Sequence, residues 1–152
     1  NINDKIYGPY EEVGLRRFSP DSSKYLFKFK KDGNWYVNIN DKIYGPYEDI
    51  DISNFSPDSS KYVFTFKKDS RKYVQINDKT YGPYDEVNSR TFSPDSSNYV
   101  FIGVKDDKYY LQINDKTYGP YDKVDFTFTK DNKLYIAYIL NKELVIEEID
   151  DF

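Results

Sequence analysis

The sequence predicts an all-β protein, a small β-propeller with four blades of four antiparallel strands each. Two repeated phrases and the distribution of aromatic residues lead to this prediction. NINDKIYGPY stands at residues 1–10 and again at 38–47, and its variant QINDKTYGPY stands at 75–84 and 112–121. The phrase FSPDSS begins at Phe18 and returns twice with the same spacing of 37 residues. The 17 Tyr and 11 Phe favour strands, and many of them alternate with polar residues.

A fixed period of this size indicates one supersecondary unit that buries its apolar face only by stacking on its neighbours. Four such units start at residues 1, 38, 75 and 112. We therefore expect residues 1–152 to form a single propeller domain built from four 37-residue repeats.

The first full repeat predicts four short strands, at residues 25–31, 35–39, 42–44 and 50–55. The first of them alternates apolar and polar side chains, which is typical of a half-buried strand. Turn signals separate the strands, at Asp32-Gly33, Asn40-Asp41, Gly45-Pro46 and Ser56-Pro57-Asp58. No window keeps a 3.6-residue period over about ten residues, so helical repeats are excluded. Four antiparallel strands joined by tight turns make one propeller blade.

The phrases FSPDSSKYLF, FSPDSSKYVF and FSPDSSNYVF resemble the signature of PD40 repeats, the WD40-like blades of TolB and of prolyl-oligopeptidase propellers. The segment INDKIYGPYEEV is similar to a stretch in bacterial members of that group. The sequence departs from the family at Ser22, Ser59 and Ser96, where the family usually has glycine. The resemblance implies a propeller fold, and a periplasmic or secreted location is the favoured expectation. The activity of the oligopeptidases does not transfer, because no part of this sequence resembles their catalytic domain.

The last repeat lacks a fourth strand, and the first ten residues carry the phrase of an outer strand with no inner strands before it. The predicted blades are therefore 13–47, 50–84, 87–121, and 124–149 completed by 1–10. Closing this ring would remove both exposed sheet edges, so a closed monomer is favoured. An end-swapped dimer with eight blades and a fragment of a larger repeat protein remain as alternatives.

Composition excludes several classes of function. The chain has 22 basic and 26 acidic residues, and a net charge of −4 with interspersed signs argues against nucleic-acid binding. No run of about 18 apolar residues is present, so no membrane insertion is expected. Cysteine and histidine are absent, which removes thiolate metal sites and the commonest general base. Each turn aspartate offers one carboxylate, too few for a calcium cage, so we expect no metal and no other cofactor.

The repeats differ from one another mainly at two places, and these supply the candidate binding residues. One place is the inner strand of each blade, and the other is the turn between its second and third strands. We expect both to lie on one face of the propeller, near the mouth of its channel. The candidates are Arg16, Arg17, Trp35, Asp51, Asn54, Arg90 and Tyr109. Neutral drift after duplication explains the same variation without any ligand.

These features favour a non-catalytic binding or scaffold module that engages a protein, a peptide or a glycan through this face. Arginines would supply bidentate hydrogen bonds, and Trp35 and Tyr109 would supply flat apolar surfaces. The alternative is a structural unit of an assembly, such as the end-swapped dimer. A hydrolase is the third class, and it would need two carboxylates about 5–10 Å apart in a cleft.

Overall fold

The computed structural model describes residues 4–150 and 152, apart from the side chains of residues 52 and 53. Every regular element in this part of the chain is a β-strand, and every pairing of neighbouring strands is antiparallel. None of the described residues forms a helix that could span a membrane. The prediction of an all-β protein is therefore confirmed.

The strands form four sheets, each built from consecutive strands of one repeat. The first sheet contains β1 (Glu12–Phe18), β2 (Tyr25–Lys31), β3 (Asn34–Ile39) and β4 (Lys42–Tyr47). The second contains β5 (Asp49–Phe55), β6 (Tyr62–Lys68), β7 (Arg71–Ile76) and β8 (Lys79–Tyr84). The third contains β9 (Glu86–Phe92), β10 (Tyr99–Lys105), β11 (Lys108–Ile113) and β12 (Lys116–Tyr121). The fourth has three strands, β13 (Lys123–Phe128), β14 (Leu134–Leu140) and β15 (Glu143–Ile149).

Gly45-Pro46 does not end the third strand of its repeat as the sequence predicted, because β4 continues through it to Tyr47. The register between β3 and β4 shifts beside Trp35, which marks a β-bulge. Gly45 has a φ of 133°, and a Cβ atom there would lie 2.9 Å from the carbonyl oxygen of Trp35. The glycine therefore lets the strand bend at the bulge without a clash.

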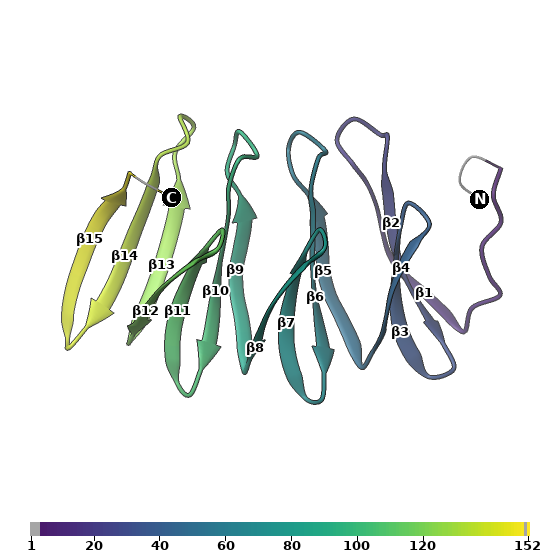
Figure 1. Cartoon of the computed structure of the whole chain (residues 1–152), viewed down its shortest axis with the longest axis horizontal. Helices are drawn as coiled ribbons and strands as arrows, with labels where there is room; N and C mark the ends of the chain where they lie inside the picture. The colour runs from purple at the N-terminus through teal and green to yellow at the C-terminus, as the bar shows by residue number, and fades with distance from the viewer. Residues whose placement is uncertain (1–3, 151) are drawn as a thin grey trace.

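The four sheets lie side by side in an open row, with the chain termini at opposite ends of it (Figure 1). The predicted ring closure, in which residues 1–10 complete the blade at 124–149, is not formed in this structure. The strand β15 pairs only with β14, and it forms the free edge of the fourth sheet. The described residues 4–10 instead pack their tyrosines against the first sheet, at the other end of the row. Residues 1–3 of the predicted closing segment lie outside the described part of the chain.

Tyrosines of each outer strand pack against the second strand of the next sheet, and this contact holds neighbouring sheets together. Tyr44 meets Phe64 edge-on with ring centroids 5.4 Å apart, and Tyr47 stacks on Phe66 at 4.0 Å. In the third sheet Gly103 takes the position of Phe66, and the ring of Tyr84 fills the space that a side chain there would need. The YGPY tyrosines thus act as wedges between neighbouring sheets at these interfaces.

The SPDSS turns add a polar contact between sheets. The carboxylate of Asp58 accepts hydrogen bonds from the hydroxyls of Ser56 and Ser60 and from the amide of Ser60, at 2.6–2.9 Å. The amide of Asp58 donates to the hydroxyl of Ser96 in the next sheet at 3.0 Å, and the amide of Asp21 donates to Ser59 at 3.1 Å.

This inter-sheet hydrogen bond gives Ser59 and Ser96 a role that a glycine could not fill. Ser59 and Ser96 have φ values of 65° and 64°, a backbone conformation that favours glycine. A glycine would lack the hydroxyl that accepts the amide hydrogen from the preceding sheet. The serine therefore accepts local backbone strain and gains a buried contact between repeats.

Phe64 is fully buried between the first and second sheets, so Phe64→Ala is expected to lower the free energy of unfolding by about 3–5 kcal/mol. The exposed Ile43 on the neighbouring β4 supplies the control, and Ile43→Ala is expected to change it by less than about 0.5 kcal/mol. Urea denaturation of both variants measures the two differences. Equal effects would show that the interfaces between sheets do not carry the stability.

The turn aspartates predict a loss of stability in acid. Hydrogen bonds from the neighbouring serines lower the pKa of Asp21, Asp58 and Asp95 in the folded chain. In the unfolded chain an aspartate has a pKa of about 3.9. Below that pH the unfolded chain binds more protons than the folded chain, so the free energy of unfolding falls as the pH drops. Urea midpoints at about pH 7 and pH 3 measure this loss, which Asp58→Asn should reduce. Asp107→Asn, on an exposed hairpin, is the control, and an equal reduction there would contradict the assignment.

Candidate functional site

The seven residues that the sequence proposed as a binding face do not all come together. Arg17 lies opposite Leu26, and Leu26 lies opposite Ile39. Trp35 lies opposite Lys30, four residues further along the same strand. The antiparallel register therefore puts Arg17 and Trp35 toward opposite ends of the first sheet, and the prediction of one shared face is wrong for these residues.

Trp35 and Tyr109 take part in packing between sheets. Trp35 lies against the cluster of side chains between the first and second sheets, with the Lys28 ammonium nitrogen 4.4 Å from its ring centroid. Tyr109 packs in the same way against the cluster between the third and fourth sheets. Both rings are half-buried, so neither presents a free flat surface to a ligand.

Asp51, Asn54 and Arg90 do come together, on the inner strands of the second and third sheets. The Arg90 guanidinium lies 3.6 Å from the Asp51 carboxylate. Burial lowers the pKa of Arg90, while the nearby carboxylates of Asp51 and Glu86 act in the opposite direction. Asn54 and Arg90 line a depression of about 160 Å³, too small for more than a small group. This part of the predicted site is an ion pair between sheets with a small hollow beside it.

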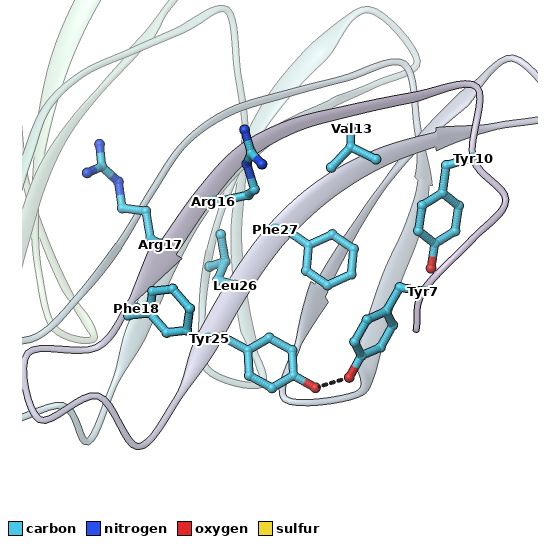
Figure 2. A pocket seen from close by; sticks show the side chains of 9 residues that line it. All are labelled: Tyr7, Tyr10, Val13, Arg16, Arg17, Phe18, Tyr25, Leu26 and Phe27. Carbon is cyan, nitrogen blue, oxygen red and sulfur yellow. Dashed lines mark hydrogen bonds between the residues drawn. The ribbon is translucent and has the colours of Figure 1, made fainter. Parts of the chain in front are cut away.

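Arg16 and Arg17 lie at a larger pocket on the end of the first sheet, with a volume of about 400 Å³ (Figure 2). Figure 2 shows the two arginines on one side of this pocket and Tyr7 and Tyr10 on the other. We call it the first-sheet pocket, and its lining residues are Tyr7, Tyr10, Val13, Arg16, Arg17, Phe18, Tyr25, Leu26 and Phe27. It combines aromatic walls with two exposed cations.

The first-sheet pocket corresponds to a surface that is covered in the next sheet. Val13 and Phe18 are 48% and 62% exposed, whereas Ile50 and Phe55, one repeat later, are 2% and 5% exposed. Ile50 and Phe55 are buried because β2 and β3 of the first sheet pack on them. The pocket is therefore one side of an interface like that between the first and second sheets, and no sheet in the described part of the chain covers it.

Residues 5–10 form one wall of the pocket and occupy the place of an outer strand. Tyr7 meets Phe27 at 5.3 Å and Tyr10 stacks on Phe29 at 4.1 Å, which repeats the geometry of the β4 tyrosines on the second sheet. The Tyr7 hydroxyl donates to Asp41 at 2.6 Å, and Lys5 forms an ion pair with the same carboxylate.

Tyr25 and Asp41 show the electrostatic consequences of this arrangement. Burial is the main cause that raises the pKa of Tyr25, and its hydrogen bonds with Tyr7 and Asp41 add to the effect. Hydrogen bonds from Lys5, Tyr7 and Tyr25 lower the pKa of Asp41. The Asp41 carboxylate is thus held ionised by three donors, and it holds Lys5 and Tyr7 against the first sheet.

Sequence reasoning identified Arg16 and Arg17 but missed the apolar part of this site. Val13 and Phe18 belong to phrases shared by all full repeats, and their copies are buried. Their sequence carries no signal that distinguishes them from the buried copies. Among the residues that the structure describes, no three His, Cys, Asp or Glu side chains gather as metal ligands. The pocket thus sets two exposed guanidinium groups beside an apolar surface.

No protein-family model matches this sequence, and neither does any curated protein. Among solved structures, the chain is similar to the β-propeller domain of the Trilobed protease from Pyrococcus furiosus, which has an open velcro topology. The identity is 14% and the TM-score is 0.57, over 94% of this chain and 58% of that one. TolB from Acinetobacter baumannii matches at 14% identity and a TM-score of 0.47, over 91% of this chain and 41% of that one. The chain thus has the fold of propeller blades and spans less than two thirds of these solved chains.

Proposed function

We propose that this chain is a non-catalytic propeller-type module that binds a protein partner at the first-sheet pocket. The observation that carries this proposal is the exposure of Val13 and Phe18, whose counterparts in the second sheet are buried. An apolar surface of this kind, beside charged groups, is typical of a protein interaction site. The propeller fold of the solved neighbours is consistent with a scaffold that presents such a surface.

The kind of partner follows from what covers the same position inside the chain. At the interface between the first and second sheets, Leu26, Val37 and Ile39 pack on Ile50 and Phe55. The covering residues Leu26, Val37 and Ile39 come from the adjacent strands β2 and β3. The surface that fits this position is therefore an aliphatic face of a β-sheet. A protein surface therefore suits the pocket better than a glycan does.

The charges around the pocket add a requirement for a carboxylate. Among the described residues, no ion pair involves Arg16 or Arg17, and both are exposed. Arg90 occupies the position of Arg16 two repeats later, and there Asp51 of the preceding sheet supplies the acidic group. A partner that places an Asp or Glu near Arg16 would repeat this pairing. The carboxylate of Asp41 already accepts hydrogen bonds from Tyr7 and Tyr25 of the pocket wall, which favours binding over catalysis.

Arrays of acidic, aliphatic-rich peptides and of glycans test this proposal on the purified chain. Phe18→Ser and Arg16→Gln are each expected to weaken the peptide binding by at least about fivefold, near 1 kcal/mol, without lowering the melting temperature. Ile43→Ser, which changes an exposed apolar residue away from the pocket, should leave the binding unchanged. Peptide binding that survives both pocket variants, or binding of glycans alone, would refute the proposal.

A further inference from the structure

The other end of the row carries an exposed apolar surface that matches the first-sheet pocket. Leu144 and Ile146 on β15 are 66% and 68% exposed. They lie opposite Ile139 and Ala137 of β14. In the first sheet the corresponding positions belong to Trp35 and Val37, and these residues pack against the second sheet. The fourth sheet thus presents the face that would cover another first sheet.

The charges at the two ends are complementary in the same way. Asp125 on β13 stands two repeats after Asp51, and Arg16 on β1 stands two repeats before Arg90. Asp51 and Arg90 form the ion pair between the second and third sheets. If a fourth sheet stacked on a first sheet in the same geometry, Asp125 would lie beside Arg16.

The fourth sheet also lacks the strand that the first residues of the chain carry. Each of the first three sheets ends in an outer strand with the sequence YGPY, whereas the fourth ends at β15. The described residues 6–10 contain the same sequence and belong to none of the sheets. Their tyrosines already sit on the first sheet in the manner of an outer strand. Residues 6–10 thus have the position of an outer strand but do not pair with a sheet.

From these three matches we propose that two copies of this chain join end to end and close into one eight-bladed ring. The fourth sheet of each copy covers the first-sheet pocket of the other, and residues 4–10 of that other copy pair with β15. This inference rests on the proposed function and names its partner as a second copy. In this dimer the exposed apolar side chains, the Asp125–Arg16 pair and both free strand edges would make the same kinds of contact that join neighbouring sheets within one chain.

A second copy fits better than closure within one chain. The two complementary ends lie at opposite ends of the row (Figure 1), because the same stacking is repeated at all three interfaces. The chain covers 58% of a larger propeller domain, and Figure 1 shows its sheets in an open row and not in a closed ring. Propellers commonly have about four to eight blades, and two copies supply eight.

Light scattering coupled to size-exclusion chromatography tests the mass of the purified chain. We expect twice the 18.1 kDa of one chain. Phe18→Ser and Ile146→Ser, at the two ends, are each expected to raise the dimer dissociation constant by at least about tenfold. Ile43→Ser is the matched control, since it also removes an exposed apolar side chain but lies away from both ends.

A charge exchange distinguishes joining in trans from closure in cis. Arg16→Glu would bring a second carboxylate next to Asp125 across the interface, and Asp125→Lys would bring a second cation next to Arg16. Each variant alone should therefore dimerise more weakly than the parent. Mixing the two variants makes both interfaces of a mixed dimer oppositely charged, and the dimer mass should return.

Several results would overturn the dimer. These are a wild-type chain that remains at 18.1 kDa at high concentration, masses that grow steadily with concentration as in an open polymer, and a mixture that does not recover. A monomer whose peptide binding is still lost in Phe18→Ser would refute only the second copy as partner. A monomer in which Phe18→Ser has no effect on any binding would refute the proposed function as well.

Discussion

The structure depends on one contact, the packing of two outer-strand tyrosines on the second strand of the following sheet. Tyr47 stacks on Phe66 and Tyr44 meets Phe64 edge-on. These rings bring large apolar area to the contact between sheets, and repeat units of this kind bury their apolar faces only by stacking on one another. Because the contact always runs from one repeat to the next, each sheet needs a neighbour on both sides. The 37-residue spacing of the phrases keeps this contact in register along the chain.

A second layer of specificity comes from polar groups at the edges of these interfaces. The amide of Asp58 reaches Ser96, and the third sheet reaches Asn132 of the last repeat through the amide of Asp95. Asn132 has a φ of 67° and replaces serine while keeping an acceptor. A hydrogen bond with this geometry forms only when adjacent turns are aligned, so it fixes how the sheets stack.

The sequence was sufficient for the strands and for the stacking of repeats, because both follow from local patterns. Alternation in residues 25–31 and turn residues such as Asp32-Gly33 specify strands wherever they occur. The continuation of β4 through Gly45-Pro46 was not predictable in this way, since it depends on a bulge opposite Trp35. The predicted gathering of Arg17 and Trp35 failed because strand register, which the pattern of variable positions does not contain, places them at opposite ends of one sheet. The first-sheet pocket was missed for a related reason, since Val13 and Phe18 have the sequence of core residues and differ only in lacking a covering sheet.

The open row and its two unmatched ends have a single physical origin. A stacking unit that is complementary to its own copy is satisfied at every internal interface and at neither end, however many copies the chain contains. Chains with this property usually bear polar residues on their terminal faces, and β15 does carry Glu143, Glu147 and Glu148. It nevertheless keeps Leu144 and Ile146 exposed on the face that an additional sheet would cover. At the other end, Phe18 and Val13 remain exposed beside Arg16. The exposed face of the first sheet thus resembles one side of the interface that the chain forms three times. The exposed face of the fourth sheet resembles the opposite side of that interface.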